Sequence, residues 1–294
     1  MLSIDDNLIL EDKNTGNLAL KLFSFEDFST FDPVQRLNYY SIIWVMEGSG
    51  TVKSDFSEFE FGANAMMAFT PYQPFMISGS ERAKGIVLNF HPDFFCIVKH
   101  HEAVACNGVL FNNIYQSPVL NLDEKTASRL EGAIEQLKDE MLHGDLAQYE
   151  LLVSYLKIIL ITASRKKVDE YGDEVLEVSG DAEPFTLKNL RKHIEEHFRT
   201  KHAPSEYADL LNMTPKALGK ATKKHFNKTM TDLIAERIMI EAKRELYLTD
   251  KQVKLIASEL GYKDEYYFSR FFKNYAEVSP QVYRETVGFA RGAA

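Results

Sequence analysis

The feature of the sequence that most restricts the fold is an internal repeat in the C-terminal third of the chain. Residues 207–223 and 256–273 align, with one extra residue in a short turn of the second copy. On either side of the turn the apolar residues follow the spacing of an α-helix. Lys220 and Arg270 occupy equivalent positions, so the copies share a basic position as well as a hydrophobic pattern. The repeat predicts two consecutive helix-turn-helix units.

Each predicted second helix begins at a residue that caps helices well. Thr214 precedes Pro215, a favoured first helical residue, and Asp264 follows Gly261, which can end a helix in a left-handed conformation. Such second helices lie in the major groove of DNA, where basic residues bind guanine or phosphate. The outer faces carry the candidate DNA-binding residues Lys216, Lys220, Lys223, Lys224, Glu265, Tyr266, Ser269, Arg270 and Lys273. The faces predicted to point inward carry Ala217, Leu218, Ala221, Phe268, Phe271 and Phe272.

The charge of the chain is unevenly divided. The whole sequence has a net charge of −9, which by itself argues against a nucleic-acid partner. Residues 183–294, however, hold 20 Lys and Arg against 15 Asp and Glu, a net +5, whereas residues 1–182 hold 14 against 28. A basic half suits a polyanionic partner, although +5 is also an ordinary protein surface. Residues 168–184 hold seven acidic residues and no basic one, which predicts a solvated linker.

The N-terminal part predicts β-structure followed by two helices. Short β-branched and aromatic runs alternate with Gly and Pro turns, which is typical of a sandwich or small barrel. The predicted strands cover residues 39–46, 51–53, 65–70, 75–77 and 85–90. From Asp123 the apolar spacing becomes helical, and Gly144 separates two antiparallel helices. The longest apolar stretch, residues 151–163, is too short to span a membrane, and the N-terminus lacks the features of a signal peptide.

Residues 255–262, 267–273 and 279–284, with Arg237 before them, resemble the signature of AraC/XylS-family transcription regulators. The resemblance covers about residues 185–284 and implies that two recognition helices enter successive segments of the major groove. It places base contacts at Lys216, Gly219, Lys220, Glu265, Tyr266, Ser269 and Arg270. The sequence departs from the family at Gly219, where members often carry a side chain that can contact a base.

The N-terminal part resembles, more loosely, the cupin-like sensor and dimerisation domain of the same family, and its two helices would form the dimer contact. Residues 151–161 are apolar on more sides than a helix covering one sheet requires. This segment holds the predicted dimerisation residues Leu152, Leu156, Ile159 and Leu160. We expect an α+β chain with two domains: a cupin-like β-barrel or sandwich with two trailing helices at 1–167, an acidic linker at 168–184, and an AraC-type all-α domain with two helix-turn-helix motifs at 185–294.

The N-terminal part offers candidate residues for a ligand pocket, whereas its histidines argue against a metal site. The candidate ligand-binding residues, each of which can equally belong to the core, are Tyr40, Ile42, Trp44, Phe69 and Phe75. The N-terminal histidines, which contain no His-x-His pair, are His91, His100, His101 and His143. We therefore expect no metal, no cofactor and no catalytic residue. Cys96 and Cys106 are too few for a disulfide framework and fit a reducing cytosol.

Together these features predict a cytoplasmic transcription regulator that binds specific sequences of double-stranded DNA. It is expected to form a homodimer, to act with RNA polymerase, and to respond to a small-molecule effector or to its dimer state. Two alternatives stay open, namely a cupin-type enzyme with an appended DNA-binding domain and a non-specific architectural DNA binder. A stoichiometric transition metal would favour the enzyme, and equal affinity for all duplexes would favour the architectural protein.

Overall fold

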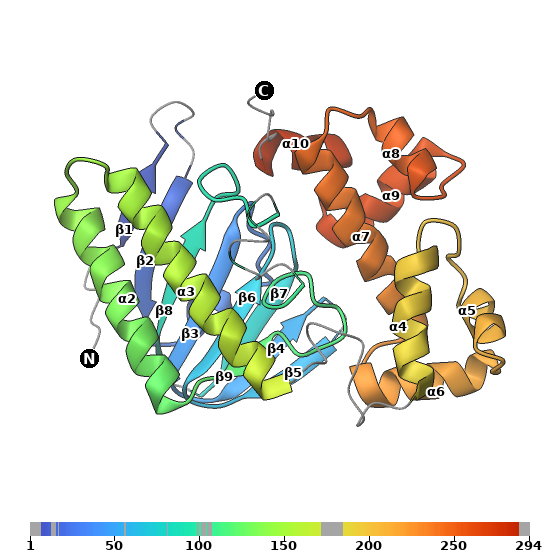
Figure 1. Cartoon of the computed structure of the whole chain (residues 1–294), viewed down its shortest axis with the longest axis horizontal. Helices are drawn as coiled ribbons and strands as arrows, with labels where there is room; N and C mark the ends of the chain where they lie inside the picture. Colours follow the sequence, from blue (N-terminus) through green and yellow to red (C-terminus); the bar gives the residue numbers. More distant parts are fainter. Residues whose placement is uncertain are drawn as a thin grey trace. The chain divides into compact units, whose positions relative to one another are not determined.

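The structure is a computed structural model of the chain, and it divides into two compact units (Figure 1). The sheet unit comprises Met1–Asn113 and Ser117–Glu170, and the helical unit comprises Ile114–Gln116 and Tyr171–Ala294. The residues that the structure describes are 7–12, 16, 18–55, 57–80, 82–98, 100, 104, 108–171 and 185–287. Residues 172–184 of the predicted linker, His101 and Cys106 thus lie outside the described residues.

The sheet unit contains two antiparallel sheets. The large sheet has the strand order β1-β2-β8-β3-β6-β9, and the small sheet has the order β5-β4-β7. The strands of the large sheet are β1 (Leu8–Glu11), β2 (Leu18–Phe25), β8 (Lys84–Phe90), β3 (Tyr40–Glu47), β6 (Ala65–Phe69) and β9 (Val119–Asn121). Those of the small sheet are β5 (Ser57–Phe61), β4 (Gly50–Ser54) and β7 (Phe75–Gly79). The described strands do not close into a barrel, so the barrel alternative is not borne out in them.

Two hydrophobic cores lie on opposite faces of the large sheet. The inner core, formed with the small sheet, includes Ile43 and Val45, and the helix-side core includes Ile42 and Trp44. Because β3 is buried on both faces, its sequence is a continuous apolar run without polar alternation. The helices that cover the second face are α2 (Glu124–His143) and α3 (Gln148–Tyr171) (Figure 1).

The helical unit packs around one long central helix, α7 (Met230–Leu248), which contacts α4, α6, α8 and α10. Its burial is extensive because Leu233, Ile234, Ile238 and Leu246 point to several sides. The other helices of the unit are α4 (Phe185–His197), α5 (Pro204–Leu210), α6 (Pro215–Phe226), α8 (Val253–Glu259), α9 (Glu265–Ala276) and α10 (Pro280–Val287). Within the described residues, no helix combines the length and the hydropathy needed to cross a membrane.

Candidate nucleic-acid interface

The two copies of the repeat have the same backbone geometry in their turns. The N–H of Met213 donates to the carbonyl of Ala208 at 2.9 Å, and the N–H of Tyr262 donates to that of Ala257, also at 2.9 Å. Ala208 and Ala257 are both buried, which permits the close approach of the helix that follows. The alignment inferred from the sequence is therefore matched by equivalent hydrogen bonds in space.

The second helix of each pair begins at the predicted cap. Thr214 Oγ1 accepts a hydrogen bond from the N–H of Ala217 at 3.2 Å, and Asp264 Oδ1 accepts one from the N–H of Tyr266 at 2.8 Å. Gly261 adopts a φ of +83° and packs against the carbonyl of Arg199, so a side chain there would be both strained and in collision. Glycine is required at this turn.

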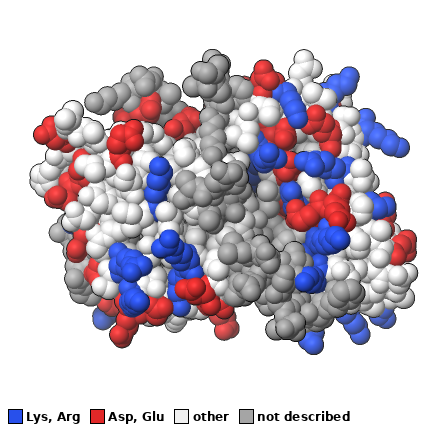
Figure 2. Space-filling view, viewed as in Figure 1, with Lys and Arg blue, Asp and Glu red and all other residues white. Residues whose placement is uncertain are grey.

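The candidate DNA-binding side chains occupy the outer faces of α6 and α9. Tyr266 is 81% exposed, and Glu265 and Ser269 are partly exposed beside it. Lys223 Nζ lies at the C-terminal end of α6, where it donates to the carbonyl of Asn227 at 3.1 Å. The candidates that the structure shows exposed are Lys216, Lys220, Lys223, Lys224, Tyr266, Arg270 and Lys273. Figure 2 shows basic side chains along the right and lower margins of the helical unit.

Two residues of α6, Ala217 and Gly219, add to or differ from what the sequence predicts. Ala217 is exposed, because Leu218 and Thr222 already fill the contact between α6 and the rest of the unit. Gly219 is half-buried, and a Cβ built on it would have no heavy atom within 4 Å. The structure therefore leaves room for a side chain at Gly219, although this chain presents only backbone there.

The helix α7 separates the two pairs. Its 19 residues correspond to a length of about 28 Å at roughly 1.5 Å per residue. In Figure 1 the pair α5–α6 lies near one end of α7, and the pair α8–α9 lies near the other. Successive major-groove segments on one DNA face are about 34 Å apart. The length of α7 is thus of the same order as this spacing.

A buried carboxylate fixes α7 to the end of α4. Glu241 is 3% exposed and accepts hydrogen bonds from Arg199 at 2.7 Å, Arg244 at 2.8 Å and Arg237 at 3.3 Å. Burial by itself would raise the pKa of Glu241, but the three guanidinium groups outweigh it and lower that pKa. Arg237 also lies over the ring of Phe198 at 3.9 Å. This network holds the scaffold that carries both helix pairs.

Sequence reasoning missed a second support, the segment Ile114–Gln116, which belongs to the helical unit. Tyr115 donates its hydroxyl to Glu195 at 3.1 Å, and its ring lies 5.7 Å from that of Phe226, the last residue of α6. Burial and the charge of Glu195 raise the pKa of Tyr115 well above its usual range. The segment lies about 70 residues before α4 in the sequence, and only tertiary structure shows that it belongs with this unit.

Lys228 anchors the same segment. Its Nζ donates to the carbonyl of Ile114 at 3.0 Å and to Glu236 at 2.6 Å, and both charged residues are buried. The ion pair lies between the end of α6 and the middle of α7. It therefore links the end of α6, the central helix α7 and the segment Ile114–Gln116.

The candidate ligand-binding residues do not form one surface. Tyr40, Ile42 and Trp44 belong to the helix-side core, whereas Phe69 and Phe75 stack on each other at 4.0 Å in the inner core. The large sheet separates the two sets, because alternate residues of β3 point to opposite faces. A surface pocket in the sheet unit lies elsewhere, between the start of α2 and the end of α3. Its lining is charged and consists of Asp123, Lys125, Thr126, Arg129, Thr162, Arg165, Lys166 and Asp169.

The proposed dimerisation residues need a correction. Leu152, Leu156, Ile159 and Leu160 are all fully buried in the helix-side core of a single chain. The second apolar side of α3 is covered by the chain itself, since Tyr149 contacts Phe94 and Lys157 lies over Phe95. The side chains of Leu152, Leu156, Ile159 and Leu160 therefore cannot contact a partner chain unless the sheet unit unfolds. The apolar residues that α3 exposes are Tyr149, Leu151 and Ile158.

Comparison with known proteins agrees with this geometry. Residues 207–286, which run from within α5 through α9 and into α10, match a family model described as a helix-turn-helix domain. The raffinose operon transcriptional regulatory protein RafR of Pediococcus pentosaceus is 30% identical over 96 residues, which cover 33% of this chain and 35% of RafR. The HTH-type transcriptional activator Btr of Bacillus subtilis (strain 168) is 31% identical over 84 residues, which cover 29% of this chain and 16% of Btr. The matched region thus spans about a third or less of these relatives.

Among solved structures, apo ToxT from Vibrio cholerae strain SCE256 aligns with a TM-score of 0.42 and 16% sequence identity. The alignment covers 92% of this chain and 99% of ToxT.

Proposed function

We propose that this chain, which carries a helix-turn-helix domain of the AraC type at residues 207–286, is a sequence-specific DNA-binding transcription regulator. The observation that carries the proposal is the pair of equivalent turns, each followed by a capped helix with an exposed polar outer face. In this proposal both helix pairs are helix-turn-helix motifs. Lys216, Gly219 and Lys220 of α6 face one groove segment, and Glu265, Tyr266, Ser269 and Arg270 of α9 face the next.

Lysines near the helix ends suit the DNA backbone, and residues near the start of α9 suit the bases. Lys223, Lys224 and Lys273 lie toward the C-terminal ends of α6 and α9, away from the ends that approach the bases. Arg270 is exposed one turn after Tyr266, so its guanidinium can form two hydrogen bonds to one guanine. We therefore assign base recognition to Arg270 and phosphate binding to Lys273.

A matched pair of variants tests this assignment. Arg270→Ala should weaken binding to the specific site by roughly 1–3 kcal/mol while changing binding to random DNA much less. Lys273→Ala should weaken binding to both duplexes about equally and should reduce the salt dependence. Sites found by genome-wide mapping supply the specific duplex, and scrambled duplexes at two salt concentrations supply the comparison. Equal losses on both duplexes for Arg270→Ala would show that Arg270 only holds the backbone.

We propose that the sheet unit controls DNA binding, through a small-molecule effector or through a homodimer, and that the protein acts with RNA polymerase in the cytoplasm. An effector that reaches either core must displace packed side chains such as Trp44 or Phe69, both of which are buried. The charged pocket between α2 and α3 is another candidate binding site, in this case for a polar ligand. Thermal shifts of the full chain with candidate ligands test this input, and an effector should also change affinity for the operator.

A further inference from the structure

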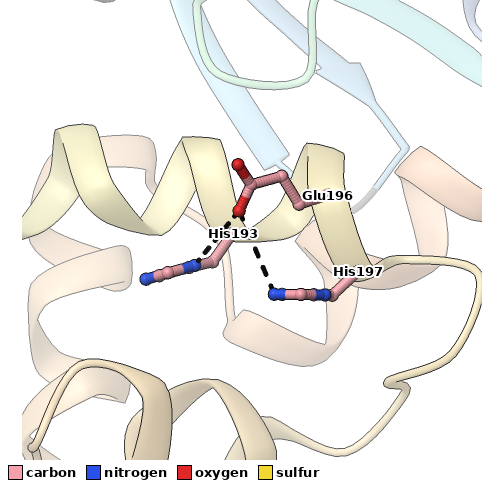
Figure 3. A group of neighbouring side chains, drawn as sticks. All are labelled: His193, Glu196 and His197. Carbon is pink, nitrogen blue, oxygen red and sulfur yellow. Dashed lines mark ion pairs between the residues drawn. The ribbon is translucent and has the colours of Figure 1, made fainter.

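Two histidines and a glutamate gather on one face of α4, in the helical unit. His193 Nδ1 lies 3.7 Å from Glu196 Oε2, and His197 Nε2 lies 4.0 Å from the same oxygen (Figure 3). One ligand atom from each of the three residues falls within 4.8 Å of the other two. His193 Nδ1 is buried and has no hydrogen-bond partner among the described residues. The ring of His193 lies nearly parallel to that of His197, at 16°.

The sequence explains why these donors meet. His193 and His197 are four residues apart and Glu196 lies between them at the third position, so all three project from one side of the helix. The spacing His-x-x-Glu-His also occurs in a class of zinc peptidases. The expected absence of a metal site concerned only the histidines of the N-terminal part, and the His-x-x-Glu-His spacing is the sequence signal for this cluster.

The distances suit a transition-metal ion after a small adjustment. Ligand atoms bound to one tetrahedral zinc at roughly 2.1 Å lie about 3.4 Å apart. The two histidine–glutamate distances, 3.7 and 4.0 Å, must therefore shorten by about 0.3 and 0.6 Å. The separation of the two histidine nitrogens, which lies within 4.8 Å, must also become about 3.4 Å. Two imidazoles and one carboxylate form a donor set that zinc commonly uses, and water can supply a fourth ligand.

The neighbouring groups leave this donor set available. Glu195 is already occupied by Arg237 at 2.7 Å and by Tyr115 at 3.1 Å, whereas Glu196 turns toward the histidines. Lys192 approaches the other oxygen of Glu196, Oε1, at 3.8 Å, so Oε2 stays open to a metal ion. In this respect the cluster differs from His143 on α2, which has one carboxylate, that of Asp139, at 3.1 Å and is exposed.

We propose that His193, Glu196 and His197 form a Zn²⁺-binding site on α4. The ion ties together the last two turns of α4, next to the arginine-carboxylate network that joins this helix to α7. Because the folded helix places the three donors together, Zn²⁺ binding also stabilises the helical unit. This site is separate from the proposed DNA-contacting faces, and its existence does not depend on the proposed function.

Calorimetric titration of the metal-free full chain with ZnCl₂ tests the proposal. We expect one equivalent of Zn²⁺ to bind. We also expect Zn²⁺ to raise the temperature at which the helical circular-dichroism signal is lost. His193→Gln and His197→Gln should each weaken Zn²⁺ binding at least about tenfold, since even residues outside the ligand shell change metal affinity by that factor. The control His143→Gln removes an exposed histidine whose ring lies near one carboxylate, that of Asp139, and it should leave Zn²⁺ binding unchanged.

Three outcomes would overturn the site: no Zn²⁺ binding by the wild type, unchanged affinity in the His193 and His197 variants, or an equal loss in His143→Gln. Circular dichroism in the presence of EDTA shows whether each variant is folded. If a histidine variant fails to fold, Glu196→Gln decides the question, because this side chain is half exposed and its substitution is mild. Unchanged Zn²⁺ affinity in folded Glu196→Gln excludes the carboxylate as a ligand and defeats the three-donor proposal.

Discussion

At the scale of single residues, the burial of Lys167 offers a test of the sheet unit. Lys167 lies on α3, is 1% exposed, and donates to the carbonyl of Ser117 at 2.7 Å. Burial lowers the pKa of its ammonium group to about 8, although the charge of Glu170 acts in the opposite direction. The lysine is thus charged at neutral pH in a site that favours the neutral form.

We predict that the stability of the wild type relative to Lys167→Met rises between pH 8 and pH 10.5. In that range the unfolded chain binds more protons at this lysine than the folded chain, so raising the pH favours folding. The shift of the pKa from 10.5 to about 8 corresponds to roughly 3 kcal/mol. Urea unfolding of both proteins at pH 7.5 and pH 10 measures the difference, because other titrating groups cancel in the comparison. A constant difference would mean that the ammonium group is solvated in the folded protein.

Residue-level prediction from the sequence worked best where one side chain bonds its own local backbone. The caps at Thr214 and Asp264 appear as expected. Between two helices, the local sequence decides less. The hydroxyl of Thr249 donates backward to the carbonyl of Glu245 at 2.7 Å, so Thr249 ends α7 and does not start α8. A threonine between two helices can bond either way, and the sequence does not decide which.

At the scale of elements, the five predicted strands correspond to β3, β4, β6, β7 and β8, whereas β1, β2, β5 and β9 were not predicted. The predicted strands at 39–46 and 85–90 correspond to β3 and β8, which are buried on both faces. The missed β9 has only three residues, and it pairs with β6 through contacts distant in sequence. We also predicted a second apolar side on α3 for a partner chain. In the structure, Phe94 and Phe95 of the same chain contact α3 at Tyr149 and Lys157.

The burial pattern of α3 leads to a contrast between two substitutions. Leu156 is 0% exposed and Ile158 is 45% exposed, although they are only two residues apart. If the chain forms the proposed homodimer through α3, Leu151 and Ile158 lie two turns apart on the face that meets the partner. We predict that Ile158→Glu yields folded monomers, whereas Leu156→Glu unfolds the sheet unit, because it buries an unpaired charge.

Light scattering gives the mass of each protein, and circular dichroism shows whether it is folded. A wild type that is monomeric at micromolar concentration would contradict the dimer itself. A dimer that survives Ile158→Glu would place the interface on another surface.

At the scale of the whole molecule, the sequence predicts two domains of opposite charge, and the structure also has two units. The boundary was harder to predict. The helix α3 continues to Tyr171, four residues into the expected linker, because a run of charged residues is compatible with a solvated last turn. More importantly, the helical unit includes Ile114–Gln116. Composition and periodicity describe continuous segments, so they cannot assign three residues to a unit that begins much later in the chain.

Because Ile114–Gln116 belongs to the helical unit, the stability of that unit depends on Tyr115. Replacing Tyr115 by Ala removes a ring that packs against Phe226 and Arg191, and it leaves Glu195 without one hydrogen-bond donor. We predict a loss of about 3 kcal/mol in the free energy of unfolding of this unit. Tyr115→Phe keeps the ring and loses only the hydroxyl, so it should cost about 1 kcal/mol.

A fragment that starts at residue 183 lacks the whole segment, and it completes the test. The fragment retains both helix pairs, so we expect it to fold and bind DNA, but Phe226 and the Lys228–Glu236 pair lose their cover. The melting temperature of the helical unit should therefore be lower in the fragment than in the full wild-type chain. It should be close to the melting temperature of the same unit in full-length Tyr115→Ala. Hydrogen exchange of the amides in α6 distinguishes this local effect from a general loss of stability. Equal protection of α6 in the fragment and in the wild-type chain would show that Ile114–Gln116 does not support α6.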